Sequence, residues 1–419
     1  MKTARGLGAF LLLFTLSLLC SAQVHDVLCR DGNGSFDVEF RTGVKVSAGP
    51  EKSGGFNQRS CQGVLSWGKQ KLVVADGVSQ FDIDLIGAEL NAGEPVVAFA
   101  IAQSAADCCM TYKIYSLQTP PRLLRTITGG GYFSAADSDL DGDVEIWTED
   151  AAAVNGFEGV SAGEIEFVPP CVLRMERGRL LDASGEFQPF FDGVIKNVRS
   201  NANPDLMQEF KLSDGRLQAK TGLSAEQLVR LSTVRKAKIQ VLEIAWAYLY
   251  SGREQDAWRT LTEMWPAEDV DRIRGEIVRA REHGIHSQLD GVSSSHRHRK
   301  RPAPIYEQKE VTPAQAILMR IYPPAEMIDM TLGKREVHVM LVVDSAGKVQ
   351  AVTMLGVTEK VEGLVVDSDS KMQGIKPLSE KQKIEQIVQT SVARWKFVPA
   401  FKSGRAVTSR MQTAVWLQR

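Results

Sequence analysis

The stretch "RWKFVPA", residues 394–400, decides how the end of this chain folds, because the hydrophobic pattern changes there. Upstream, the sequence predicts a helix with one buried face, formed by Ile384, Ile387, Val388, Ser391 and Val392. Downstream, residues 410–417 alternate and predict a last strand, one face of which carries Met411, Thr413, Val415 and Leu417. Pro399 ends the helical pattern and fixes an extended exit. Trp395 and Phe397 are therefore expected to close the helix onto a sheet.

A β-hairpin is predicted before this helix. One face of its first strand is formed by Val337, Val339, Leu341 and Val343. A turn at 344–348 leads to a second strand, in which one face is expected to hold Val349, Ala351, Thr353 and Leu355. Ser379 is expected to begin the helix, with Gln382 as its capping partner. The predicted order is strand, strand, helix, strand.

That order resembles the C-terminal domain of TonB-family proteins over residues about 315–419. The resemblance rests on "VVDSAGKV" at 342–349 in the first turn and on "WKFVPAFKSGRAV" at 395–407 after the helix. The segment "YPPAE" at 322–326 also fits the family. The signature residues are Trp395, Phe397 and Pro399.

The resemblance implies contact between proteins in the periplasm. In TonB-family proteins the last domain pairs a strand with a short extended segment of an outer-membrane transporter. Such β-augmentation uses the unpaired backbone groups of a sheet edge. Carried over to this chain, the partner-binding residues are Met411, Gln412, Thr413, Ala414, Val415 and Trp416. The partner is expected to be an extended strand of a transporter or of a second copy.

This sequence departs from the family pattern in three ways. It begins with a signal-like segment where the family has an anchor, and it lacks a long proline-rich spacer. It also inserts "VEGLVVDSDSKMQGIKP", residues 361–377, between hairpin and helix. A detached, non-enzymatic binding module in an exported protein is therefore expected. A membrane-anchored TonB-type energy transducer for outer-membrane transport remains the alternative.

The first 22 residues indicate export. Lys2 and Arg5 precede an apolar run, residues 7–19, and Ala22 ends a small-residue cleavage site. A cleaved signal peptide would place the protein in the periplasm or otherwise outside the cytoplasm. An uncleaved anchor remains open, and only that form would contact a membrane. A lipid on Cys20 also remains open, although Leu19 fits such a site poorly.

Composition indicates several packed domains and excludes few partners. The chain has 419 residues, 43% of them hydrophobic, and a net charge of −1, which gives no reason to expect bulk nucleic-acid binding. Five cysteines follow the predicted cleavage site: Cys29, Cys61, Cys108, Cys109 and Cys171. An oxidising compartment permits disulfides. Cys29–Cys61, with Cys171 joined to one of the adjacent pair, is one arrangement among many, and buried free thiols are another.

Residues 24–200 predict an all-β domain, built as a sandwich or a few blade-like sheets, because short β-forming runs alternate with turn residues. Within it, "DSDLDGDVEIW" at 137–147 spaces acidic residues alternately around Gly142. This suits a hard cation such as Ca²⁺ and resembles the loops of FG-GAP or integrin-type repeats. The implied ligands are the side chains of Asp137, Asp139, Asp141 and Glu145 and the carbonyl of Asp143. An acidic surface turn without metal remains the alternative.

Residues 204–285 predict helices. Ser224 and Gln227 form a capping box, and residues 239–266 resemble a single tetratricopeptide-like hairpin that turns at Gly252. A partner groove or a structural spacer fits this hairpin. Residues 286–314 predict a flexible linker whose basic run at 296–301 contacts solvent, anionic lipid or a metal. The expected class is thus multidomain α+β: an N-terminal all-β domain, a central helical hairpin region and a C-terminal ββαβ domain.

No enzyme class is favoured by the motifs. The sequence has no H-E-x-x-H, no phosphate-binding Gly-Lys loop and no dinucleotide fingerprint. Paired carboxylates alone leave a secreted glycan-active hydrolase as the alternative of another class. Two facing carboxylates in a deep pocket of the β domain would favour it.

Overall fold

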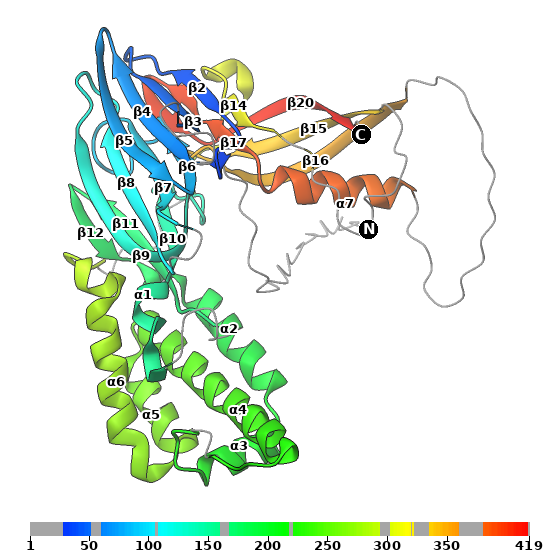
Figure 1. Cartoon of the computed structure of the whole chain (residues 1–419). Coiled ribbons are helices and arrows are strands. Elements are labelled where there is room, and N and C mark those ends of the chain that lie inside the picture. Colours follow the sequence, from blue (N-terminus) through cyan, green and yellow to red (C-terminus); the bar gives the residue numbers. More distant parts are fainter. Residues whose placement is uncertain are drawn as a thin grey trace, which may run out of the picture.

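The computed structural model describes residues 28–51, 60–104, 108–159, 167–217, 221–293, 302–319, 321, 335–359 and 380–417. Several predictions fall outside these residues: the signal segment 1–22, the basic run 296–301, "YPPAE" at 322–326, the insertion 361–377 and the helix cap at Ser379. The fold is mixed α+β (Figure 1). A β domain carries helices at one end and a C-terminal sheet with its own helix at the other.

Two sheets form the β domain. The larger has the order β1-β6-β7-β8-β9-β10-β11-β12-β13, antiparallel except for the last pair. Its strands are β1 (Cys29–Arg30), β6 (Gln80–Ile86), β7 (Val96–Ala102), β8 (Met110–Ser116), β9 (Leu123–Ala136), β10 (Glu145–Asp150), β11 (Pro170–Glu176), β12 (Arg179–Asp182) and β13 (Gly291–Val292). The smaller, in sequential order, contains β2 (Phe36–Glu39), β3 (Lys45–Pro50), β4 (Cys61–Trp67) and β5 (Gln70–Val78).

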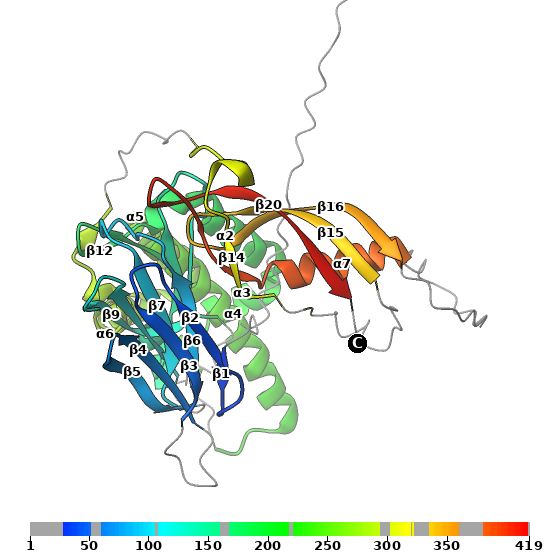
Figure 2. The ribbon, with the colours of Figure 1, turned by 90° about the horizontal axis from the view of Figure 1, so that it is seen from above.

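The small sheet packs on the N-terminal strands of the large one (Figure 2). The approach is close at Gly63, where an added Cβ would lie 1.8 Å from the Phe81 ring. The disulfide Cys29–Cys61 joins the two sheets. Cys108 and Cys109 are bonded to each other, and Cys171 is a buried free thiol, so the pairing of Cys171 considered above does not form.

The helical region follows β12. It contains α2 (Gln188–Asn201), α3 (Pro204–Lys211), α4 (Ala225–Tyr250), α5 (Glu254–Met264) and α6 (Val270–His283), while the short α1 (Ala151–Val154) follows β10. Single turns of 3₁₀ helix are η1 (Phe157–Gly159), η2 (Ser184–Phe187), η3 (Ala267–Asp269), η4 (Ile285–Gln288) and η5 (Gln308–Glu310). The predicted hairpin of α4 and α5 is present. Fully buried Ala245 and Ala257 lie at its contact, and Gly252 turns the chain at φ +77°.

The predicted extent of the all-β domain is wrong at its C-terminal end, because α2 begins at Gln188. Phe191, Ile195 and Val198 are buried on one face at helical spacing, and Pro189 lies in the first turn. Asp150 then ties helices to sheet: its carboxylate accepts hydrogen bonds from Tyr250 Oη (2.7 Å) and the Ile285 amide (2.9 Å). The helical region therefore shares one apolar core with the β domain.

The C-terminal region contains β14 (Gln315–Leu318), β15 (Arg335–Val343), β16 (Val349–Glu359), α7 (Glu380–Val392), β17 (Lys396–Val398), β18 (Ala400–Lys402), β19 (Arg405–Val407) and β20 (Ser409–Leu417). Its main sheet has the order β16-β15-β20, so the predicted strand, strand, helix, strand order is present, with β17 and the β18–β19 hairpin added before the last strand. Trp395 and Phe397 are buried between α7 and this sheet, as predicted.

One predicted face of this sheet is wrong. Ala351, Thr353 and Leu355 are exposed, whereas Val349, Val352 and Met354 pack against the core. The register explains the difference, because Val343 pairs with Val349 but Val342 pairs with Ala351, which leaves Gln350 as an extra residue. Such a β-bulge reverses the facing of the residues that follow it, here as far as a second irregularity at Leu355, relative to strict alternation.

The C-terminal region is not detached from the β domain. Leu318, Val398 and Phe401 belong to the same apolar cluster as the core of the two β sheets. The Phe401 ring lies 6.0 Å from Phe40, and the Arg41 guanidinium lies 4.1 Å from the centre of the Phe401 ring. Both described ends of the predicted linker are also packed: β13 pairs with β12, and residue 312 pairs with Phe401. The prediction of a flexible linker is therefore wrong for the described parts of residues 286–314.

Candidate cation centre and partner-binding edge

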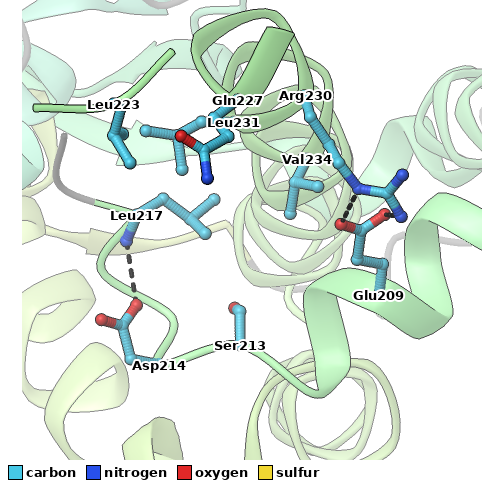
Figure 3. A pocket seen from close by; sticks show the side chains of 9 residues that line it. All are labelled: Glu209, Ser213, Asp214, Leu217, Leu223, Gln227, Arg230, Leu231 and Val234. Carbon is cyan, nitrogen blue, oxygen red and sulfur yellow. Dashed lines mark hydrogen bonds and ion pairs between the residues drawn. The ribbon is translucent and has the colours of Figure 1, made fainter. Parts of the chain in front are cut away.

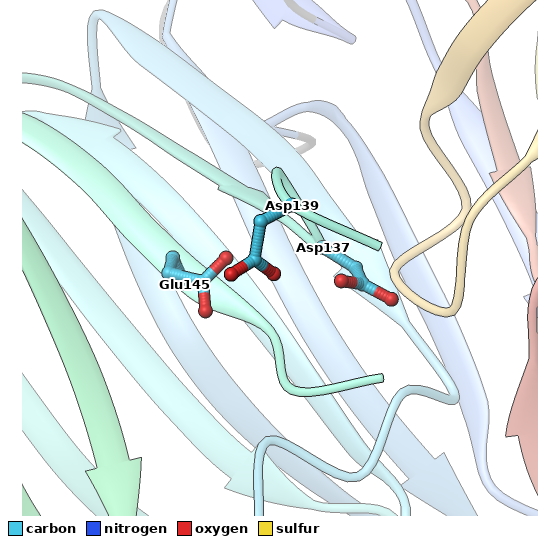
Figure 4. A group of neighbouring side chains, drawn as sticks. All are labelled: Asp137, Asp139 and Glu145. Atoms are coloured by element: carbon cyan, nitrogen blue, oxygen red, sulfur yellow. The ribbon is translucent and has the colours of Figure 1, made fainter. Parts of the chain in front are cut away.

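The acidic loop lies between two paired strands of the large sheet. Asp137 directly follows β9, and Glu145 is the first residue of β10, where it pairs with Ala136. Gly142 allows the tight return because it adopts φ +93°. The ladder thereby fixes both ends of the loop, and Asp137, Asp139 and Glu145 lie side by side (Figure 4).

Three of the five predicted acidic residues form a group. Carboxylate oxygens of Asp137, Asp139 and Glu145 all lie within 4.8 Å of one another, and Asp137 and Glu145 are fully buried. Asp141 and Asp143 are not part of this group. Asp141 instead accepts a hydrogen bond from the Asp143 amide (2.8 Å), which turns its carboxylate into the loop.

The group fits a cation on one observation in particular. Oδ1 of the fully buried Asp137 has no hydrogen-bond partner among the described residues, while Oδ2 accepts from the Gly142 amide (3.1 Å) and from Ser345 Oγ (3.3 Å). Burial, and then the nearby Asp344 carboxylate, raise the pKa of Asp137 to about 7. A cation would satisfy an anionic oxygen that is otherwise costly to bury.

Arg174 pairs with one member of this acidic group. Its guanidinium, 1% exposed, donates to Glu145 Oε1 (2.7 Å) and to Glu186 (2.8 Å). Burial opposes the charge, but these two carboxylates raise the pKa of Arg174 above its ordinary value. Glu145 Oε2 accepts from the Ser138 amide (3.1 Å). Glu145 is thus held in place by a permanent cation, and Asp137 and Asp139 remain as the main donors to a metal.

The second candidate site is the outer edge of β20. The order β16-β15-β20 makes β20 an edge strand, and it pairs with β15 along its whole length. Among the described residues, contacts on this edge are made at its start, where the Tyr306 amide donates to the Thr408 carbonyl (3.0 Å) and the Tyr306 carbonyl accepts from the Arg410 amide (2.8 Å). Since the Arg410 amide points away from β15, the alternation of a strand turns the amides of Gln412 and Ala414 outward too.

The predicted partner-binding residues of β20 differ in burial. Met411 and Val415 pack against the domain core. Gln412 is exposed, and Thr413 and Ala414 are half-buried. Trp416 lies within β20. Pro399 is buried directly after β17.

Sequence reasoning missed a buried charge network at the contact between regions. Lys396 pairs with Asp82 (2.5 Å), and Lys348 pairs with Asp84 (2.6 Å). Asp84 also accepts from Tyr112 Oη (2.7 Å). Burial opposes ionisation, but Lys348 and then Lys396 hold the pKa of Asp84 below its ordinary value. The available signal was two aspartates inside the apolar run "FDIDLI" and a lysine between Trp395 and Phe397.

A pocket of about 400 Å³ opens among the helices, between α3 and the start of α4 (Figure 3). Its apolar lining includes Leu217, Leu223 and Val234. At its rim Glu209 accepts from Arg230 (2.7 Å), so this carboxylate is already paired. The pocket lies in the helical region and contains none of the residues predicted as a site.

Comparison of the chain with protein-family models, with curated proteins and with solved structures finds no match in any of the three. Among the described residues, no helix has the length and apolar character needed to cross a membrane.

Proposed function

We propose that this is an exported, non-enzymatic protein-interaction protein whose C-terminal TonB-like module pairs β20 with an extended strand of a partner. The observation that carries the proposal is the outer edge of β20, where the amides of Gln412 and Ala414 point away from β15. Family resemblance supplies the kind of partner: an extended segment of an outer-membrane transporter, or β20 of a second copy. The membrane-anchored transducer would use the same edge.

Tyr306 supports this use of the edge. It forms a parallel bridge to Ser409 and makes two backbone hydrogen bonds at the start of β20. The edge therefore accepts extended backbone in the native fold. A partner strand that continues past residue 410 would meet further outward amides and carbonyls, and backbone pairing would supply most of its affinity.

We further propose that Ca²⁺ is a structural cofactor held by Asp137 and Asp139, with Glu145 beside them. Three carboxylates around one point suit a hard cation. Oδ1 of Asp137, which has no hydrogen-bond partner among the described residues, supports cation binding. Glu145 contributes less to the cation, because it is already paired with Arg174. A cation here would hold the loop between β9 and β10.

The edge is tested with the full chain, because the C-terminal region shares its core with the β domain. Extended peptides from transporter N-termini, and the chain itself, are titrated by calorimetry and by analytical ultracentrifugation. Ala414→Pro should weaken capture at least about tenfold, because it removes an outward donor and leaves the ladder to β15 intact. Gln412→Ala is the matched control and should bind as the unmodified chain does, since it keeps the backbone.

Thr413→Pro checks the assignment of facing, since its amide points to β15 and its loss should disrupt the domain itself. Circular dichroism and amide exchange establish which variants stay folded. Absence of binding by every probe, with β20 amides protected on both sides, would contradict the proposed function. N-terminal sequencing of the exported protein separates the two forms: a start at or near Gln23 supports the cleaved protein, and an intact Met1 the transducer.

A further inference from the structure

The acidic loop lies at the seam between the β domain and the C-terminal region. The Asp137 amide donates to Asp344 Oδ2 (3.0 Å), and Ser345 Oγ donates to Asp137 Oδ2 (3.3 Å). Further along the loop, the Ala303 amide donates to the Leu140 carbonyl (2.7 Å). Residues more than 150 positions away in sequence therefore contact the loop at two points.

Asp344 is held rigidly at this seam. It is fully buried in the β15–β16 turn and accepts from the Ala346 amide (2.9 Å), the Lys348 amide (2.8 Å) and Gln350 Nε2 (2.6 Å). The bulged Gln350 described above is thus one of the groups that orient the carboxylate. The turn presents a fixed buried carboxylate to the backbone of Asp137.

The buried carboxylates of Asp137 and Asp344 therefore lie near each other across the seam. The nearby basic side chains already form ion pairs with other carboxylates: Lys348 with Asp84, and Arg174 with Glu145 and Glu186. Like charges in a dry environment repel strongly. A positive charge bound beside Asp137 would offset the repulsion between these two carboxylates.

We infer that a divalent cation bound by Asp137 and Asp139 clamps the C-terminal module to the β domain, so that cation binding and module docking stabilise each other. The inference rests on the proposed cation site. The cation neutralises Asp137 and relieves its repulsion from Asp344. Because linkage is reciprocal, a docked module must raise the affinity of the loop for the cation by the same factor.

This coupling differs from a cation that staples only its own loop. In that case the affinity depends on the ligands and the loop alone. Changes across the seam that do not touch the loop separate the two cases. Lys396→Met removes the partner of Asp82, and Phe401→Ala removes the ring that packs on Phe40; both sites lie outside the loop and weaken docking.

The experiment measures CaCl₂ binding to the full chain by calorimetry, with MgCl₂ for comparison. Asp139→Asn, whose side chain is a ligand, should abolish binding. Lys396→Met and Phe401→Ala should each weaken binding about tenfold, within the range typical of coupled sites. Lys45→Met breaks an exposed Lys–Asp pair of similar length and should leave the affinity unchanged.

Each outcome decides one question. If the unmodified chain binds no Ca²⁺, the proposed cofactor fails and the coupling with it. If it binds and the seam variants bind equally well, the site stands and the clamp is wrong. Circular dichroism confirms that each variant is folded, and because the two seam contacts are independent, either folded variant suffices.

Discussion

Lys396 lies between two core aromatic residues and carries its charge to Asp82 of the β domain. Removing one partner of a buried ion pair leaves the other charge unpaired. Lys396→Met should therefore lower the free energy of unfolding by about 3–5 kcal/mol. The control Lys45→Met removes the exposed partner of Asp37 and should cost less than about 1 kcal/mol. Urea unfolding of both variants makes the comparison. Equal losses would mean that the buried pair contributes no more than a surface one.

Glu149 on β10 gives the protein a pH dependence of defined sign. Burial raises the pKa of Glu149 to about 7. The folded state therefore favours the protonated form, and the stability that this contributes is complete below the unfolded pKa and is lost as pH rises through 7. Glu149→Gln is neutral at every pH. It should differ little from the unmodified chain at pH 5 and exceed it at pH 8 by roughly 1–3 kcal/mol. Chemical unfolding at both pH values checks this, and an equal gain at both would contradict it.

Residue-scale prediction works where partners are close in sequence. The alternation of Asp137, Asp139 and Glu145 marks one loop, and the structure gathers these three carboxylates. It does not reveal Asp344, because 207 residues separate that carboxylate from the amide it accepts. The pairing of Lys396 with Asp82 spans 314 residues. Periodicity carries no information about such contacts, although a charge within an apolar run signals that a partner is needed.

Among the elements, α4 begins with the predicted capping box. Ser224 Oγ accepts from the Gln227 amide, and Gln227 Oε1 accepts from the Ser224 amide. Ser224→Ala should cost about 1 kcal/mol. The first turns of α4 are largely exposed, so the loss should appear as faster amide exchange there. Thr233→Ala, on the same helix, removes only a bond to the Val229 carbonyl and should leave the exchange of the first turn unchanged. Equal exchange in Ser224→Ala would show that the box is not needed.

At this scale the strand faces show what local patterns miss. The faces of β15 and β20 follow strict alternation, and both were predicted. The face of β16 was not, because Gln350 is inserted opposite the Val342–Val343 step. The insertion is oriented by a hydrogen bond to Asp344, which is a contact within the folded turn. The start of α2 was also missed, although Phe191, Ile195 and Val198 have helical spacing.

For the whole molecule, shared cores predict shared unfolding. The β domain shares one apolar cluster with the helical region and another with β14, β17 and β18. We expect one main calorimetric transition for the full chain, with a calorimetric enthalpy close to the van't Hoff value. Deleting residues 302–419 should lower the melting temperature of the remainder, at roughly 2–4 °C per kcal/mol lost. Three separate transitions, or an unchanged melting temperature after deletion, would show that the regions are independent.

The regions themselves were recognisable from composition and period, but the contacts between them were not. The change from short β runs to helical spacing marks the helical region, and "RWKFVPA" marks the last one. The seams depend on side chains such as Phe401, Leu318 and Lys348, whose local patterns only indicate burial. Three different sequence patterns therefore predict three separate domains, whereas the structure shows that these regions share hydrophobic cores.

The pairing of Asp82 with Lys396 also bears on how the chain folds during its synthesis. At ribosomal rates of about 5–20 residues per second, the 314 residues between them take roughly 15–60 s to emerge. For most of that interval the nascent β6 carries two aspartates inside an apolar run without their partners, because Lys348 follows Asp84 by 264 residues and Lys396 is made later still. The surface of the large sheet at β6 stays uncovered until the C-terminal region has been made. A holding chaperone would be needed during that interval.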